Sequence, residues 1–429
     1  MTDLRVLFVA HGHPAIDAGG AELYAHALCR EVGRREGWES YYLARTIASA
    51  YLGERDTPFR SMRGRSDEVL WVPDGYDDFY LSSSRKKQYS FHLDAFLEHY
   101  RPDVVDVQHT NGIGLDLVRQ IRTSLPDTPI VYTFHEFQPI CHARGLMLRT
   151  FGDQLCDLAS PDRCHACFPE IPPHRFLMRE YLIKSHLGHV DLFLAPSRFL
   201  RDRFVEWGIE PDRIRHHPNG CLLPAKILAE VDESSRPSTH SFGFFGQLAH
   251  HKGVLVLLRA IKRLVDSGER RVRLALHGTN LEYQTPAFRD ELSRLVEELR
   301  GHVVLAGRYE TRELPSLLRD VAWIVTPSIW WENSPLVIQE AFALGRPVIC
   351  SDIGGMAESV ADGVNGLHFR VGDPMSLAET LRRACESEGL WSRLREGIPE
   401  TRSMAAAAAA QIEVYGSLLR TRRPVAVSR

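Results

Sequence analysis

The stretch that decides the fold reads Trp331-Glu332-Asn333-Ser334-Pro335-Leu336-Val337-Ile338-Gln339-Glu340, with two carboxylates eight positions apart. Serine is a preferred N-cap residue, and proline suits the first helical position because its missing N–H is not needed there. A helix is therefore predicted to begin at Pro335, with Glu332 in the loop before it and Glu340 inside it. The amides that follow Pro335 would face an anion at the helix end. This pattern favours a sugar-bearing nucleotide diphosphate with one carboxylate on each side.

Composition and charge limit the classes of protein that the chain can be. Its 429 residues, 44% of them hydrophobic, are enough for two or three domains with their own cores. The net charge of −3 gives no reason to expect nucleic acid as a partner. No run approaches the length of a membrane-spanning helix, and the first ten residues lack the features of a signal peptide. A cytoplasmic location is expected, with the inner face of the membrane as an alternative place of action.

Short apolar runs alternate with helix-like patterns along most of the chain. Their valine, isoleucine, leucine and phenylalanine content is typical of strands buried on both faces of a parallel sheet. These strands are expected at residues 5–10, 104–108, 130–134, 192–195, 242–245, 273–276, 303–305, 323–325 and 348–350. Between two of them, residues 253–265 carry apolar side chains at helical spacing. The alternation predicts an α/β fold.

A change of composition near residues 218–241 divides the chain. Residues 225–240 are polar and have no sustained apolar face, so we expect one domain over residues 1–218 and a second over residues 219–403. Residues 404–429 contain six consecutive alanines and are predicted to form a helix and tail that could pack back on the first domain.

Two further segments resemble ligand-binding turns. Gly19-Gly20-Ala21-Glu22 opens a helix after the first strand, and paired glycines let a backbone approach a phosphate or another polar group. A flexible turn is the alternative. The G-x-G-x-x-G spacing is absent, so a nicotinamide enzyme is poorly supported. Lys252 stands at the start of a helix, where an ammonium group could neutralise a diphosphate; a solvated surface lysine is the alternative.

In this order and combination, the motifs resemble the retaining glycosyltransferases of family 4. The resemblance covers nearly the whole chain and also includes Asn219-Gly220, Phe245-Gly246-Gln247, Pro327-Ser328, Gly345-Arg346-Pro347-Val348, Gly354-Gly355 and Asn365-Gly366. It implies the α/β fold called GT-B, in which two Rossmann-type domains have parallel sheets that face each other across a cleft. The acceptor side would be residues 1–218, and the nucleotide-sugar side would be residues 219–403.

The same resemblance implies an enzyme that moves a sugar from a nucleotide-diphosphate-sugar donor to an acceptor hydroxyl with retained configuration. The acceptor could be a glycan, a lipid-linked saccharide or a natural product, as in polysaccharide biosynthesis, and no catalytic metal is expected. Two alternatives are a nucleotide-sugar epimerase of the same fold and a non-catalytic module that binds sugar nucleotides. The presence of both Glu332 and Lys252 speaks against the binding module.

On the nucleotide-sugar side, the resemblance implies that Glu340 holds the ribose hydroxyls and that Glu332 lies near the donor sugar. Lys252 would bind the diphosphate together with the backbone near Ser334, Pro335 and Leu336. The remaining candidate residues lie in both predicted domains. His135 would lie close to the reacting sugar.

Gly20, with Gly19 before it, would approach the phosphates or the acceptor. The family often has an arginine five residues before the lysine. Here Gln247 stands at that position and can donate a hydrogen bond but no charge. Arg308 is a candidate substitute for the missing cation.

Four of the eight cysteines fall in one insertion, residues 138–170, which has little apolar periodicity. A C-x₂-C pair and two further thiols can bind structural zinc, and the ligands would be Cys141, Cys156, Cys164 and Cys167. His142 and His165 are alternative ligands. Reduced thiols without metal and an iron–sulfur cluster are the other interpretations. Because the insertion follows His135, we expect it to shape acceptor selection.

A group of basic residues precedes the second predicted strand. They are Arg60, Arg63, Arg65, Arg85, Lys86 and Lys87. Such a group could make peripheral contact with anionic lipid or with a polyanionic acceptor. A solvated loop is the alternative.

Overall fold

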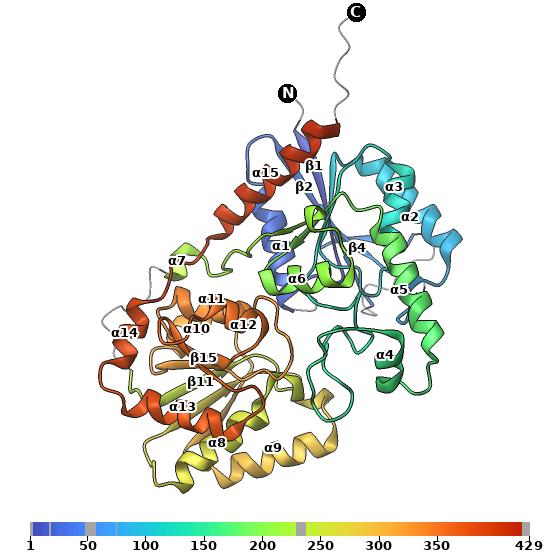
Figure 1. Ribbon diagram of the computed structural model, residues 1–429. Helices are drawn as coiled ribbons and strands as arrows, with labels where there is room; N and C mark the ends of the chain where they lie inside the picture. Colours follow the sequence, from blue (N-terminus) through green and yellow to red (C-terminus); the bar gives the residue numbers. More distant parts are fainter. Residues whose placement is uncertain (1–2, 17–18, 48–56, 74, 229–236, 423–429) are drawn as a thin grey trace, which may run out of the picture. The chain divides into compact units, whose positions relative to one another are not determined.

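The computed structural model describes residues 3–16, 19–47, 57–73, 75–228 and 237–422. It divides into two compact α/β units (Figure 1). Unit 1 comprises Met1–Leu146, Cys156–Gly220 and Arg402–Arg429, and unit 2 comprises Met147–Leu155 and Cys221–Thr401. Part of the polar connection, residues 229–236, and the last part of the tail, residues 423–429, lie outside the described residues.

Within its described residues, unit 1 is built on an eight-stranded sheet in which every neighbouring pair is parallel except β3–β4. Its order is β10 (Ile214–His216), β9 (Leu192–Ala195), β8 (Ile130–Thr133), β7 (Val104–Val107), β1 (Leu4–Ala10), β2 (Trp38–Arg45), β4 (Arg65–Trp71) and β3 (Phe59–Met62). A short hairpin, β5 (Tyr76–Asp77) and β6 (Ser82–Ser83), stands apart. All residues of β7, β8 and β9 are buried, because helices cover both faces.

The helices of unit 1 form two layers on this sheet (Figure 1). On one face lie α1 (Gly20–Val32) and α15 (Met404–Arg422), and on the other lie α2 (Lys86–Tyr100), α3 (Asp116–Ser124) and α5 (Pro173–Leu187). The remaining elements are α4 (Pro161–Cys167), α6 (Arg198–Trp207) and η2 (Pro211–Arg213). The alanine-rich α15 packs against α1, and it buries Ala407, Ala408 and Tyr415.

Unit 2 contains a six-stranded parallel sheet in its described part. Its order is β13 (Val303–Gly307), β12 (Arg273–His277), β11 (Ser241–Phe245), β14 (Trp323–Thr326), β15 (Val348–Ser351) and β16 (Gly366–Phe369). In order of appearance within the unit this is 3-2-1-4-5-6, the order of the Rossmann fold. The two α/β units with their parallel sheets confirm the predicted fold class.

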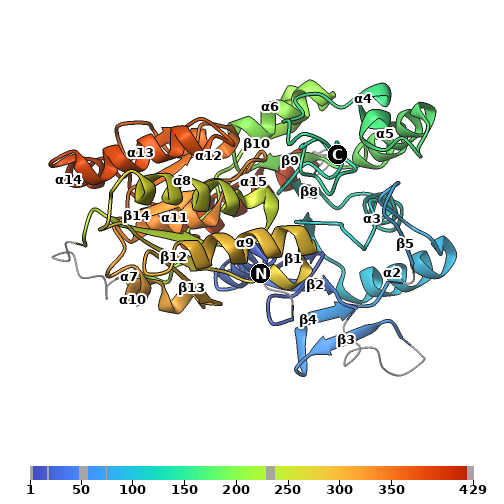
Figure 2. The same ribbon diagram turned by 90° about the horizontal axis from the view of Figure 1, so that it is seen from below.

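Helices also cover both faces of the unit 2 sheet (Figure 1). One layer holds α8 (Val254–Asp266), α9 (Pro286–Glu298) and α13 (Pro374–Glu386), and Figure 2 shows α8 and α13 side by side. The other layer holds α10 (Leu314–Leu317), α11 (Leu336–Ala343) and α12 (Gly354–Ser359). The smaller elements are α7 (Ala225–Leu228), α14 (Leu390–Glu396), η3 (His250–Lys252), η4 (Leu281–Tyr283) and η5 (Thr311–Glu313).

The predicted amphipathic helix at residues 253–265 is α8, whose buried side chains include Val254, Leu257 and Leu264. None of the helices in the described part of the chain combines the length and the apolar character needed to cross a bilayer.

Candidate active site

The strand order of unit 2 places a topological switch point between β11 and β14, where the connections leave on opposite faces of the sheet. In open α/β sheets, ligands bind outside the carboxyl ends of the strands at such a point. The loop after β11 carries Gln247 and Lys252, and the loop after β14 carries Glu332. The structure therefore brings the two loops that hold most of the predicted donor residues to one edge of one sheet.

These two loops pack closely because of a glycine. Gly253 is the N-cap of α8 and has φ +71°, a conformation that other residues adopt only with strain. A Cβ at this position would overlap the backbone carbonyl of Pro327 in the other loop. Gly253 thus sets how near Lys252, the residue before it, comes to the loop after β14.

Glu332 is the centre of the polar contacts in the second loop. It is 8% exposed, and its Oε1 accepts hydrogen bonds from Lys252 Nζ (2.6 Å), Ser328 Oγ (2.7 Å) and Trp330 Nε1 (2.9 Å). Burial raises the pKa of Glu332, but the Lys252 charge and these hydrogen bonds outweigh burial and lower the pKa below its usual value. Glu332 is therefore ionised, and it holds the Lys252 ammonium in place.

The backbone of Glu332 is anchored as well. The Gly355 amide in α12 donates to the Glu332 carbonyl over 2.8 Å, and a Cβ at Gly355 would overlap the carbonyl of Asn333. The glycine pair quoted in the sequence thus lets α12 approach this loop.

The helix after this loop starts one residue later than predicted. Pro335, expected at the first helical position, has ψ 118° and is the N-cap, so α11 begins at Leu336. Ser334 therefore does not cap the helix, and its hydroxyl accepts a bond from Gln339 Nε2 (3.1 Å) instead. A proline side chain cannot cap, and the described residues supply no side-chain cap at this end. The first amides of α11, at Leu336 and Val337, remain suited to an anion.

Glu340 lies in the middle of α11 and is 8% exposed. Burial raises the pKa of its carboxyl group to about 7. A carboxylate in such a place gains from hydroxyl donors, which would stabilise its charged form. The other two candidates for diphosphate contact are both exposed: Gln247 lies after β11, and Arg308 lies after β13.

Unit 1 has its own switch point, between β1 and β7, and a cluster of titratable side chains lies there. His11 follows β1, His109 follows β7 and His135 follows β8. The rings of His11 and His109 have centroids 4.0 Å apart. His11 Nε2 is 2.7 Å from Glu22 Oε1, and His109 Nε2 is 3.4 Å from Glu136 Oε1.

The charge state of this histidine–glutamate cluster follows from burial. Burial lowers the pKa of His109 well below its usual value and that of His135 to about 3, so both rings are neutral at pH 7. Burial also raises the pKa of Glu136 to about 8, which keeps that carboxyl largely protonated. For Glu22, the His11 contact outweighs burial and lowers the pKa. The cluster therefore offers hydrogen-bonding groups and one carboxylate, a better match to hydroxyls than to a phosphate.

Sequence reasoning singled out His135 from this cluster and quoted Glu22 within a motif, but it missed the roles of His11, His109 and Glu136. The two glycines lie where they were expected: Gly19 is the N-cap of α1, and Gly20 is its first residue. A Cβ at Gly19 would meet the Glu22 carboxylate. The helix end that was expected to attract a ligand thus already has an anionic side chain beside it.

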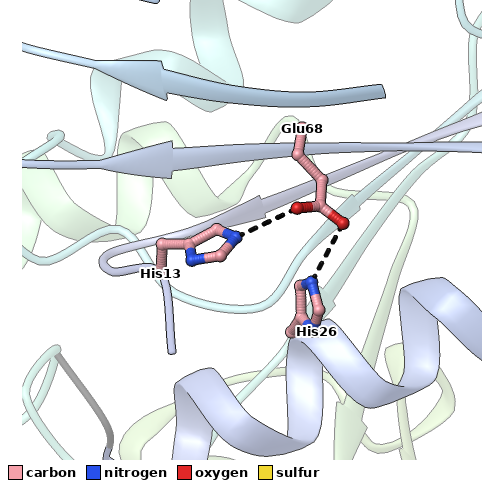
Figure 3. A group of neighbouring side chains, drawn as sticks. All are labelled: His13, His26 and Glu68. Atoms are coloured by element: carbon pink, nitrogen blue, oxygen red, sulfur yellow. Dashed lines mark hydrogen bonds and ion pairs between the residues drawn. The ribbon is translucent and has the colours of Figure 1, made fainter. Parts of the chain in front are cut away.

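A second histidine–glutamate group lies elsewhere in unit 1. Among the described residues, it is the one set of three or more histidine, cysteine and acidic side chains with ligand atoms within 4.8 Å of one another. Figure 3 shows its members, His13, His26 and Glu68, with both rings directed at the carboxylate. The distances to the carboxylate oxygens are 3.3 Å from His13 and 3.2 Å from His26.

Two contacts argue against a metal in this group. The Ala15 amide donates to His13 Nδ1 (3.2 Å), which places the proton of a neutral ring on Nε2, the atom that a metal would need. In addition, Arg30 and Arg65 lie 3.6 Å and 3.3 Å from Glu68 Oε1. The group is best described as hydrogen-bonded and ion-paired, with His13 donating to Glu68.

The predicted zinc ligands are all thiols in the structure. Cys164 and Cys167 are three residues apart in α4, and Cys156 and Cys167 are close enough to influence the pKa of Cys164. Cys141 and Cys164 both lie close enough to Arg179 to raise its pKa, although burial lowers that pKa overall. However, among the described residues, no three of these side chains have ligand atoms within 4.8 Å of one another. This holds for the four thiols and also when His142 and His165 are included. Zinc binding by these residues stays a prediction.

The predicted basic group lies on β3, β4 and the start of α2. Arg65 forms ion pairs with Asp67 (2.5 Å) and Glu68 (3.3 Å), so its charge is compensated within the protein. Lys86 and Lys87 are exposed at the start of α2. Contact of this group with lipid stays a prediction.

Two family models match the chain. Residues 18–221 match the model described as Glycosyltransferase Family 4, and residues 239–387 match the model described as Glycosyl transferases group 1. Together they span most of both units, and the chain belongs to the family 4 glycosyltransferases. The resemblance seen in the sequence and the predicted class of enzyme are thereby confirmed.

Individual proteins agree with this assignment. Over 428 residues, the chain is 26% identical to a D-inositol 3-phosphate glycosyltransferase of Xylanimonas cellulosilytica, which covers 95% of this chain and 94% of the relative. Among solved structures, sucrose-phosphate synthase from Thermosynechococcus elongatus is similar with a TM-score of 0.70 at 18% identity, covering 97% and 100% of the two chains. Anabaena HepE in complex with UDP and glucose is similar with a TM-score of 0.64 at 17% identity, covering 96% and 100%.

Replacing Gly253 should separate the loop contact from simple backbone strain. Gly253→Ala is expected to lower the melting temperature and weaken nucleotide-sugar binding, because it adds the overlap with Pro327 to a strained φ. Gly301→Ala is the matched control, since Gly301 has φ +86° but no atom within 4 Å of the added Cβ. The control should lose only about 1 kcal/mol of unfolding free energy. Equal melting temperatures for the two variants in thermal unfolding would contradict the contact.

Proposed function

We propose that this glycosyltransferase transfers a sugar, with retained configuration, from a nucleotide-diphosphate-sugar donor bound by unit 2. The observation that carries the proposal is the Lys252–Glu332 pair beside the uncapped amino end of α11. A diphosphate at this place would meet an ammonium group and the first amides of a helix, which both favour negative charge. The same groups would stabilise the charge that develops on the leaving phosphate.

The other donor contacts follow from burial and position. Glu340, one and a half turns into α11, would accept hydrogen bonds from two ribose hydroxyls. Glu332 has its Oε1 fully engaged by three donors, which leaves Oε2 as the atom to meet a hydroxyl of the donor sugar. The complex of Anabaena HepE with UDP and glucose makes uridine the first base to test.

The acceptor would bind at the histidine–glutamate cluster of unit 1. Its neutral rings and protonated Glu136 can exchange hydrogen bonds with several hydroxyls, and the ionised Glu22 can accept from one. A front-face mechanism needs no dedicated base, because the departing phosphate itself takes the acceptor proton. His135 and Glu332 would then orient hydroxyl groups rather than act as the acid–base pair of a glycosidase.

A panel of donors tests the function. The purified protein is incubated with UDP-, GDP- and ADP-sugars, with and without polyol and saccharide acceptors, and nucleotide release and sugar products are followed. Acceptor-dependent nucleotide release with retained anomeric configuration is the expected result. Isomerisation of the sugar without transfer would indicate the epimerase, and binding without turnover would indicate the binding module; either result contradicts the proposal.

The affinity for the donor should depend on pH through Glu340. Ribose hydroxyls donate to the carboxylate, so binding needs the ionised form, and a pKa of about 7 makes that form more abundant as the pH rises. UDP-glucose, whose own phosphates do not titrate in this range, should bind about tenfold more tightly at pH 8 than at pH 6. Glu340→Gln should weaken binding and abolish this dependence in calorimetric titrations. A wild-type affinity that does not change with pH would contradict the assigned role.

We also propose that Cys141, Cys156, Cys164 and Cys167 bind structural zinc. The support is that α4, which carries two of them, has no fully buried side chain, so apolar packing gives this short helix little stability. Metal analysis of the purified protein should find about one zinc per chain. Cys164→Ser/Cys167→Ser should lose the zinc, whereas Cys385→Ser, outside the insertion, should keep it. Wild-type protein without bound zinc would contradict the proposal.

A further inference from the structure

Asp106 is a carboxyl group in the centre of the unit 1 sheet. It lies in β7, flanked by valines, and is fully buried. Its Oδ1 accepts a hydrogen bond from Gln108 Nε2 (2.7 Å), and its Oδ2 accepts bonds from Gln411 Nε2 (2.7 Å) and the Tyr415 hydroxyl. Burying an ionisable group in a sheet is costly, and packing alone would be served better by an apolar residue. The three donors indicate that Asp106 has a specific task.

The hydrogen bonds of Asp106 fix the orientation of the next polar residue, Gln108. A carboxylate can only accept, so Gln108 must turn its amide nitrogen toward Asp106, and the same nitrogen donates to Thr133 Oγ1 (3.2 Å). The amide oxygen of Gln108 then faces His135, with 2.9 Å between Oε1 and Nε2. Because this oxygen can only accept, the neutral His135 ring must carry its proton on Nε2.

We propose that Asp106 and Gln108 are positioning residues that set the tautomer and ring orientation of His135, and that α15 holds them in place through Gln411 and Tyr415. With the proton on Nε2, that nitrogen donates to Gln108, and Nδ1 is the ring nitrogen of His135 that can accept a hydrogen bond. The inference rests on the proposed role of His135 beside the reacting sugar. The proposal also means that α15, which begins more than 260 residues after His135 in the sequence, helps to orient the His135 ring.

A purely structural reading is that Asp106 only ties α15 to the sheet. The two readings differ in what Asp106→Asn does. Asparagine keeps one acceptor oxygen and replaces the other with an NH₂ group. Because two donors converge at the Oδ2 position and one at the Oδ1 position, the oxygen is expected at Oδ2 and the NH₂ group opposite Gln108.

The NH₂ group would force the Gln108 amide to flip and present its own NH₂ group to His135. Nε2 of His135 must then accept, and its proton moves to Nδ1.

The tautomer is measured directly by ¹⁵N–¹H correlation spectra of histidine-labelled full-length protein, with His135→Asn used to assign the signals. Wild-type His135 should carry its proton on Nε2, and Asp106→Asn should move it to Nδ1. In the transfer assay, Asp106→Asn should lower kcat at least tenfold and change the donor KM less, because most of the proposed donor contacts, at Lys252, Glu332, Glu340 and the amino end of α11, lie in unit 2; an inverted histidine tautomer is known to impair catalysis strongly.

Tyr415→Phe is the matched control. It removes the Tyr415 hydroxyl, which makes one of the two hydrogen bonds from α15 to Asp106, but it leaves a carboxylate opposite Gln108. The Nε2 tautomer and most of kcat should therefore persist. The proposal is overturned if the wild-type proton is on Nδ1, if Asp106→Asn keeps it on Nε2, or if the tautomer inverts while kcat stays unchanged. The spectra need no enzymatic turnover, so a missing transferase activity would count against the proposed function and not against the tautomer assignment.

Discussion

The 2.6 Å bond between the Lys252 ammonium group and the Glu332 carboxylate is the interaction on which the donor side depends. It joins the loops that follow β11 and β14, and both partners need it. Glu332 is buried and would be left as an uncompensated charge without Lys252, a loss on the order of 3–5 kcal/mol for such pairs. Lys252 in turn is held at the place where a diphosphate can meet the amino end of α11. The glycines at 253 and 355 are needed because side chains there would push these segments apart.

The two units have the same kind of sheet, but their switch points favour ligand groups of different charge. At the switch point of unit 2, an ammonium group and helix amides favour an anion, as a leaving diphosphate requires. At the switch point of unit 1, the neutral His109 and His135 and the protonated Glu136 favour uncharged hydroxyl groups. This division of charge follows from burial, which neutralises isolated titratable groups, and from the ion pair with Lys252, which keeps Glu332 charged.

The sequence predicted the central strands well because they are short apolar runs, buried on both faces. It missed β2 and β4, whose first three residues include charged and polar side chains and are not buried, and it also missed β3, β10 and β16. Among the site residues, Glu332, Glu340 and Lys252 stand in recognisable local motifs. His11, His109 and Glu136 do not, and only the strand order brings their loops together. A usable signal was present, since His11, His109 and His135 each follow a predicted strand within one residue. The link from α15 to Asp106 has no local signature, because it joins residues 305 and 309 positions apart.

The central claim is that the Lys252 ammonium group and the amino end of α11 bind the diphosphate of the donor. The most direct measurement compares the binding of UDP-glucose and of uridine to wild-type protein and to Lys252→Met by titration calorimetry. The account predicts that the substitution weakens UDP-glucose at least tenfold and leaves uridine, which has no phosphate, almost unchanged. Equal loss for both ligands, or no loss for UDP-glucose, would show that the diphosphate is bound somewhere else.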